Sequence, residues 1–280
     1  MRRARVAHHF TVDVEEYFQV SAFETVIARS AWANLESRVS RGVECLLELL
    51  ARFRTRGTFF ILGWVAERRP GLVQAIVGGG HEIASHGWDH RRVTEQSPDE
   101  FRSSVRRTKQ LLETLGGGVV RGFRAPSFSI VPGYEWALDL LIEEGYTYDS
   151  SLFPVRRRGY GYPSGRRDPH WLDRRAGRLA ELPPATLRRC GLTLPAGGGA
   201  YFRLFPYGFV AAALRESERR GMAATFYIHP WELDPDQPRL RAPWTTRVRH
   251  YGGLAFTTRR LERLLSEFRF APAFETVAVM

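Results

Sequence analysis

The chain has 280 residues, of which 41 are Lys or Arg and 30 are Asp or Glu, so its formal net charge is +11. Apolar residues make up 44% of it, a globular composition that excludes an intrinsically disordered protein. No apolar run approaches the roughly 20 residues that cross a bilayer, which excludes an integral membrane protein. The basic start at 1–5 lacks the apolar stretch of a secretory signal, and Cys45 and Cys190 are too few for a disulfide scaffold. These features predict a soluble, cytoplasmic, enzyme-sized protein.

The positive charge is almost entirely arginine, because Lys109 is the only lysine. A basic surface attracts anionic glycans, lipid headgroups or nucleic acid. The arginines are scattered along the chain, with one local concentration at 156–158, 166–167 and 174–175. No zinc finger, helix-turn-helix signature or RNA-binding aromatic motif accompanies them, so we expect no nucleic-acid partner and a solvated position for most of the arginines.

Short apolar runs alternate with amphipathic stretches through the first half of the chain. The spacing predicts strands at 10–14, 58–62, 81–85, 119–123 and 146–149, and helices at 39–53, 70–77 and around 136–142. A further helix is predicted after Ser97, because Ser97-Pro98-Asp99-Glu100 supplies an N-cap, a first-turn proline and a capping-box glutamate. This alternation predicts a parallel sheet wrapped by helices, either open or closed into a barrel.

The segment from about 150 to 207 breaks the alternation. It is rich in Arg, Gly and Pro, and it predicts loops with short strands. Regular structure returns with a helix around 209–220, a strand at 223–228 and a last helix through 261–268. Because neither low-complexity linkers nor repeats appear, we expect a single domain over 1–280 with a loop-rich insertion at 150–207.

Two clusters at predicted strand ends suggest a metal site. Asp13 and Glu15 are two residues apart, so on one strand they face the same way, and two adjacent carboxylates repel unless a cation or proton joins them. His86 and His90 are four apart, and in a helical turn they would point to one side and chelate one ion. Two histidines with one carboxylate leave positions open for water, as in catalytic sites. Taken singly, an acidic loop and a pair of surface histidines are the plainer readings.

Two further residues stand at strand ends. Arg124 follows a short strand, and it could pair with a buried carboxylate and hold it ionised. His229 ends the apolar run 225–228 and is a candidate general acid or base. A surface arginine and a satisfied core histidine are the alternatives. The joint occurrence of all four clusters favours a catalytic site.

The ordered clusters resemble the polysaccharide deacetylases of the NodB-homology superfamily, which are metal-dependent carbohydrate esterases. Further segments are most similar to the subgroup linked to exosortase and exopolysaccharide gene clusters, namely 13–18 (DVEEYF), 58–63 (TFFILG), 145–151 (GYTYDSS) and 201–207 (YFRLFPY). The resemblance spans nearly the whole chain. It implies an α/β fold, a distorted (β/α) barrel in which 208–280 completes the barrel.

By this resemblance Asp13 is the catalytic base, Arg124 orients it, His229 is the general acid, and His86 and His90 are metal ligands. Many members have adjacent aspartates in the first motif, whereas this chain has Val14 after Asp13. Spacing on the strand makes Glu15 the preferred third ligand, with Glu16 as the alternative. The family's aspartate–tryptophan motif is also absent, and neither Asp149 nor Trp231 is given its role.

The implied reaction is removal of acetyl groups from N-acetylated sugars of a polysaccharide or lipid-linked glycan in exopolysaccharide biosynthesis. One divalent ion, expected to be Zn²⁺, would lower the pKa of a water and stabilise the developing oxyanion. Backbone N–H groups near Ser127 could add an oxyanion donor, and Trp171, Tyr201 and Trp231 could stack on sugars. A peripheral contact with the cytoplasmic membrane face, through the arginines near 156–175, is a further hypothesis.

Two other classes of function compete with the deacetylase. One is a catalytically inactive glycan-binding protein on the same fold, which Val14 favours and the retained Asp13, His86 and His229 oppose. The other is a hydrolase of a different amide of the cyclic ureide type. The long insertion at 150–207 has room to shape a groove, and it favours an extended glycan.

Overall fold

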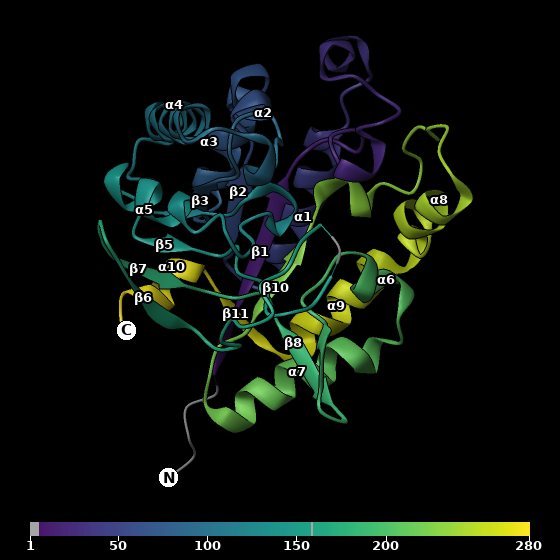
Figure 1. Ribbon diagram of the computed structural model, residues 1–280. Helices are drawn as coiled ribbons and strands as arrows, with labels where there is room; N and C mark the ends of the chain where they lie inside the picture. Colours follow the sequence, from purple (N-terminus) through teal and green to yellow (C-terminus); the bar gives the residue numbers. More distant parts are fainter. Residues whose placement is uncertain (1–5, 158) are drawn as a thin grey trace.

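A computed structural model describes residues 6–157 and 159–280, so the basic start at 1–5 and Arg158 of the predicted arginine concentration lie outside the described residues. One sheet forms the centre (Figure 1). Its strands follow the order β10 (Thr225–Ile228), β1 (Ala7–Val14), β2 (Thr58–Ile61), β3 (Glu82–Ser85), β4 (Gly122–Phe123), β5 (Tyr148–Asp149), β7 (Gly177–Glu181) and β6 (His170–Arg174), with β11 (Arg269–Ala271) also paired to β1. All pairs are parallel except the β6–β7 hairpin. The predicted α/β class is confirmed.

The two ends of the parallel run come close to each other. The regular ladder is open between β7 and β10, but the chain leaving β7 runs beside β10 and bridges Pro184 to Thr225. The Ala185 N–H donates to the Thr225 carbonyl oxygen at 2.9 Å, and the Thr225 hydroxyl donates to the Leu182 carbonyl oxygen at 3.3 Å. Isolated bridges therefore span the gap, as expected for a distorted barrel.

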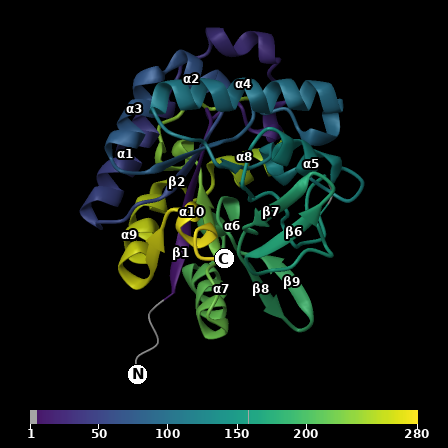
Figure 2. The ribbon, with the colours of Figure 1, turned by 90° about the vertical axis from the view of Figure 1, so that its left-hand side faces the viewer.

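Helices follow most of the strands and pack on the outer face of the sheet. They are α1 (Val39–Arg52), α2 (Gly63–Arg68), α3 (Pro70–Gly78), α4 (Pro98–Gly116), α5 (Trp136–Glu143), α7 (Tyr207–Arg220) and α9 (Thr257–Glu267). Figure 2 shows α1, α2, α3 and α4 together on one side of the sheet. The predicted capping box opens α4, where the Ser97 N–H donates to the Glu100 carboxylate at 2.8 Å.

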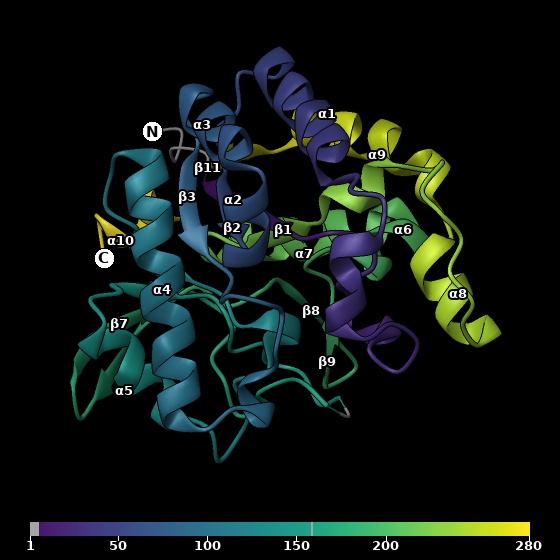
Figure 3. The ribbon, with the colours of Figure 1, turned by 90° about the horizontal axis from the view of Figure 1, so that it is seen from above.

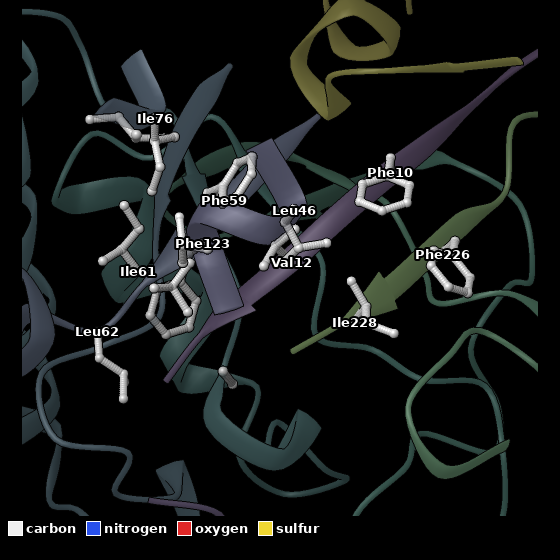
Figure 4. Packing of buried hydrophobic residues seen from close by; sticks show 14 of the residues in the cluster. Phe10, Val12, Leu46, Phe59, Ile61, Leu62, Ile76, Phe123, Phe226 and Ile228 are labelled. Atoms are coloured by element: carbon white, nitrogen blue, oxygen red, sulfur yellow. The ribbon is translucent and has the colours of Figure 1, made fainter. Parts of the chain in front are cut away.

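Alternation along β1 separates an apolar core from a polar interior. Phe10 and Val12 point outward, toward Leu46 of α1 and the flanking strands, in a cluster without solvent exposure (Figure 4). Thr11 and Asp13 take the other phase and face the inside of the barrel, where they contact Arg124. Burial of the apolar phase thus fixes which β1 side chains reach the interior.

The segment predicted to be loop-rich contains two hairpins, β6–β7 and β8 (Thr186–Arg189) with β9 (Leu192–Pro195). The predicted strand at 119–123 is shorter than expected, because Lys109 and Glu113 take the backbone groups of Val120. Several short elements were not predicted from the sequence: α2, α6 (Ala200–Leu204), α8 (Trp244–Tyr251), β11 and α10 (Ala273–Val277). Viewed from above, α8 projects at one edge of the molecule (Figure 3). Within the described ranges, every helix is too short or too polar to span a bilayer.

Candidate active site

The carboxyl ends of β1 and β4 bring Asp13 and Arg124 together. Arg124 has no solvent exposure, and its Nη1 donates to Asp13 Oδ1 at 2.6 Å and to the Thr11 hydroxyl at 2.8 Å. Its other nitrogens donate to the backbone carbonyl and hydroxyl of Ser150, and its guanidinium lies 4.1 Å from the Phe60 ring centroid. Since these contacts fix the guanidinium on every side, Asp13 is held by a rigid cation.

His86 and His90 converge on one point, but not in the way that their spacing suggested. The predicted helical turn is wrong: residues 86–90 form a loop after β3, in which Gly87 has φ 75° and His90 has φ 57°. His86 Nδ1 donates to the Arg124 carbonyl oxygen at 2.8 Å, which leaves Nε2 for another partner. Burial lowers the pKa of His86 to about 4, so it is neutral, the form that binds metals.

Glu15 completes this group, and Glu16 does not belong to it. Glu15 Oε2 lies 2.8 Å from His90 Nε2, and one ligand atom from each of Glu15, His86 and His90 falls within 4.8 Å of the other two. Glu16 points the other way, where its carboxylate accepts from the Ser37 hydroxyl and the Arg38 N–H. Of the two carboxylates that the sequence left open, geometry therefore selects Glu15.

The chemistry of this group fits a divalent cation. Glu15 Oε2 is buried, and His90 Nε2 is its close neighbour at 2.8 Å, while Glu15 Oε1 accepts from Trp231 Nε1 at 3.1 Å. Burial alone would raise the pKa of Glu15, but the charges of His90 and His229 lower it to about 2. An ionised carboxylate beside two imidazole nitrogens is a donor set for zinc-like ions.

His229 faces the same centre from the end of β10. Its Nε2 lies 3.9 Å from Asp13 Oδ2 and 3.8 Å from Glu15 Oε1. On its other side, Nδ1 donates to Glu232 Oε1 at 2.7 Å. Burial would lower the pKa of His229, but the negative charges of Glu15, Glu232 and Asp13 raise it to about 9. At neutral pH the ring therefore carries a proton that can be donated.

Sequence reasoning did not identify the residues behind His229. Glu232 has no solvent exposure, and its second oxygen pairs with Arg203, which reaches in from α6. Arg203 also donates to the backbone carbonyl oxygen of Arg249 at 2.9 Å. Glu232 could have been found, because a glutamate three residues after His229 matches capping-box spacing. Nothing in the sequence points to Arg203.

One cavity of about 410 Å³ is lined by the carboxylates and histidines of the site, namely Asp13, Glu15, His86, His90 and His229, whereas Arg124 and Glu232 do not line it. Tyr201 and Trp231, two of the three aromatics suggested for sugar stacking, line it, and so does Ser127. Trp171 does not; it lies on β6, beneath Arg178. The insertion contributes Gly159 and Tyr160 to the wall.

Comparison with known proteins adds to this geometry. A family model described as polysaccharide deacetylase matches residues 30–138, a range that includes His86, His90 and Arg124. Residues 30–138 therefore match the polysaccharide deacetylase family. A second family model, of a domain of unknown function (DUF3473), matches residues 150–278.

Sequence relatives and structural neighbours of the chain agree with the resemblance noted from the motifs. Over 95 residues the chain is 30% identical to a peptidoglycan-N-acetylglucosamine deacetylase from Bacillus cereus, and the aligned part is 34% of each chain. The chain therefore spans about a third of that relative's length. A solved structure described as a polysaccharide deacetylase from Mycobacterium smegmatis has a TM-score of 0.67 and 23% identity, with 99% of this chain and 91% of that chain covered.

The same fold also occurs in an enzyme with a different activity. An allantoinase has a TM-score of 0.63 and 19% identity, with 97% of this chain and 89% of that chain covered. Likeness at this level of identity establishes the distorted-barrel fold and leaves the activity to the side chains of the site.

Proposed function

We propose that the protein is a metal-dependent hydrolase that removes acetyl groups from N-acetylated sugars of a glycan. One observation supports this above all others. An open set of two histidines and one carboxylate shares a cavity with an arginine-paired aspartate and a protonated histidine. Amide hydrolysis needs these three functions together: Lewis acidity, a base for water and an acid for the leaving amine.

Each residue has a distinct part in the proposal. Glu15, His86 and His90 would hold one divalent ion, expected to be zinc, which supplies Lewis acidity when bound. Asp13 accepts the proton of the attacking water, and Arg124 holds Asp13 in place through the 2.6 Å contact. His229 donates its Nε2 proton to the departing amine nitrogen while Glu232 holds Nδ1 at 2.7 Å. Asp13 and His229 both line the cavity, with Oδ2 and Nε2 3.9 Å apart, so base and acid can act on one substrate.

The substrate class follows from the wall of the cavity and from the relatives. The Bacillus cereus relative is named for peptidoglycan N-acetylglucosamine. Gly159, Tyr160 and Tyr201 lie within 150–207, and they support a role for this insertion in shaping a glycan groove within one domain over 1–280. We further propose an exopolysaccharide or lipid-linked glycan as the substrate, met at the cytoplasmic side of the membrane.

Metal content measured by mass spectrometry tests the proposal first, because it requires no knowledge of the substrate. We expect about one divalent ion per chain in the wild type, lost in His90→Ala. His170→Ala is the matched control, since His170 is a buried histidine whose Nδ1 bonds the Asp168 carbonyl oxygen outside the site. It should retain the ion.

Acetate release from N-acetylated oligosaccharides is the second measurement, with allantoin hydrolysis run in parallel. Release by the wild type and by His170→Ala, but not by His90→Ala, would support the deacetylase. A metal-loaded protein that opens allantoin and releases no acetate would assign the site to cyclic ureides. A protein that binds glycans and takes up no metal would be the glycan-binding alternative.

A further inference from the structure

Exposed apolar side chains are concentrated beside the cavity. Of eleven large apolar residues with high exposure in the described chain, six lie between 204 and 256. Four of them lie on α8 or at the end of α6 and form what we call the α6–α8 surface: Leu204, Phe205, Trp244 and Val248. Trp244 is 74% exposed, which is unusual for so large an apolar side chain.

Contacts show that the two helices present this surface together. Trp244 and Val248 are one turn apart on α8, so they lie on the same face of the helix. Leu204 reaches the other end of α8: a Cβ atom on Gly252 would lie 2.7 Å from Leu204 Cδ2 and 2.5 Å from the Val248 carbonyl oxygen. Phe205 follows directly, with its ring 5.8 Å from that of Tyr201 in the cavity wall.

The chain around this surface is uniformly basic. Residues 237–261 include six arginines and neither aspartate nor glutamate. Arg241 and Arg247 are exposed, and in the described ranges no acidic side chain pairs with either of them. Of the arginines first suggested for a membrane contact, Arg167 pairs with Glu216 and Arg174 pairs with Asp139, each at 2.7 Å. Other exposed arginines of that segment, such as Arg156 and Arg166, also lack an acidic partner in the described ranges, but α8 combines such arginines with exposed apolar side chains.

Helix α8 joins this surface to the cavity. Thr246, Arg249 and His250 line the cavity, whereas Trp244 and Val248 of the same helix are exposed to solvent. A body that contacts the outer face of α8 would therefore lie next to the cavity opening. Figure 3 shows α8 at the edge of the molecule, where a flat surface can reach it.

We propose that the α6–α8 surface docks on an anionic phospholipid bilayer. Tryptophan and aliphatic side chains beside unpaired arginines are the composition of interfacial membrane-binding segments, in which arginines attract anionic headgroups and apolar groups enter the acyl boundary. A sugar-binding surface would instead place amide and carboxylate side chains around its aromatics. This inference goes beyond the proposed hydrolase, since docking requires neither metal nor turnover.

Vesicle flotation tests the docking directly. The wild type should bind vesicles of phosphatidylglycerol and phosphatidylcholine, and it should bind vesicles of phosphatidylcholine alone at least about tenfold more weakly. Trp244→Ser/Val248→Ser and Arg241→Gln/Arg247→Gln should each weaken binding to the anionic vesicles by about tenfold or more. Circular dichroism melting would show that both variants remain folded.

A matched control comes from the β8–β9 hairpin. Arg189 and Leu192 face each other there, and both are exposed, so Arg189→Gln/Leu192→Ser removes similar groups from another surface. It should bind vesicles as the wild type does.

Quenching of tryptophan fluorescence by brominated lipid is a further measurement, and it should be weaker in Trp244→Phe than in the wild type.

Two results would overturn the docking proposal. Unchanged vesicle binding in both α8 variants would place the contact elsewhere. Binding to a soluble anionic polysaccharide such as heparin, with none to anionic vesicles, would assign the surface to glycan. In either case metal uptake and acetate release would be unaffected, so the proposed hydrolase would stand or fall separately.

Discussion

Two pairs of buried carboxyl groups lie near Arg124, and the two pairs differ in the charged groups that surround them. Asp13 and Glu15 face cations: Arg124 donates to Asp13, and His90 and His229 lie beside Glu15. Asp149 and Glu181 lie opposite each other in the β5–β7 register. All four are almost fully buried, so burial does not account for the difference.

The pKa shifts of Glu181 and Glu15 go in opposite directions: Glu181 is shifted toward the protonated form and Glu15 toward the ionised form. Burial, and then the charge of Asp149, raise the pKa of Glu181 well above its usual range. Glu181 Oε2 finds no donor among the described residues, and a proton on it supplies the missing hydrogen bond to Asp149. Arg124 bonds Ser150 on this side, not the carboxylates. Because their neighbours differ, Asp13 and Glu15 are available for catalysis, whereas Asp149 and Glu181 connect β5 and β7.

The largest expected effect comes from removing the charge at Asp13. Asp13→Asn keeps the shape of the side chain but cannot take a proton from water. We expect turnover to fall by roughly 10²- to 10⁴-fold, the usual contribution of a general base, with metal content unchanged. Acetate release and metal content measured on one preparation test this.

Asp149→Asn is the matched variant in the other pair. It also removes a buried carboxylate, but one that does not line the cavity, so we expect little change in turnover. If Asp13→Asn turned over normally, Asp13 would not be the base, and the distinction between the two pairs would lose its functional meaning.

Next in size is the effect of Glu15 on metal affinity. Glu15→Gln should weaken binding by at least about 100-fold, more than the loss typical of residues that only support a ligand. Glu16→Gln, one residue along, should leave metal affinity unchanged, because Glu16 bonds Ser37 and Arg38 on the far side of the strand. Isothermal titration with Zn²⁺ measures both. Equal losses in the two variants would contradict the assignment of Glu15.

Much of this site was predictable because of strand geometry. The carboxyl ends of parallel strands meet at one edge, so Asp13, His86, Arg124 and His229 converge although they are far apart in sequence. Alternation on β1 likewise favours Glu15 over Glu16, and it explains Val14, which faces the apolar core. The helical turn proposed for His86 and His90 was wrong, yet the loop brings both rings to the same point.

Other features depended on information that the sequence does not display. Arg203 comes from an irregular segment, and its path to Glu232 follows from tertiary packing. The pairing of Asp149 with Glu181 depends on the register of β7 against β5, across the insertion. Helix α8 was missed because its apolar side chains Trp244 and Val248 face solvent, so they give no core-facing pattern.

A smaller effect on turnover is expected at Glu232, which holds His229 without facing the cavity. Glu232→Gln keeps a hydrogen-bond acceptor near Nδ1 but removes its charge. We expect kcat to fall by about 10- to 100-fold, less than the roughly 10²- to 10⁴-fold that a general acid contributes. KM and metal content should hardly change. A rise in KM with constant kcat would instead mean that Glu232 shapes the substrate pocket.

The smallest expected effect is on the pH dependence of the free energy of unfolding, which should reflect Glu181. Because the pKa of Glu181 is raised in the folded protein, the folded chain keeps a proton that the unfolded chain has already released. At any pH between the unfolded and the folded pKa, unfolding therefore releases this proton. Stability contributed by this proton is therefore full below the unfolded pKa and is lost as pH rises, by at most about 1.4 kcal/mol per pH unit. Glu181→Gln carries a permanent amide hydrogen and does not titrate. Relative to the wild type, it should gain stability as pH rises from 5 to 8, by at most about 1.4 kcal/mol per pH unit.

Urea unfolding at these two pH values measures the gain, and Glu82→Gln sharpens the comparison. Burial also raises the pKa of Glu82, but the Thr58 and Tyr148 hydroxyls and the Phe274 N–H already donate to its carboxylate. Removing the charge there leaves donors without an anion, so this variant should lose stability at both pH values. An unchanged pH dependence in Glu181→Gln would mean that Asp149 and Glu181 are both ionised in the folded protein. The two carboxyl pairs would then differ only in where they lie relative to the cavity.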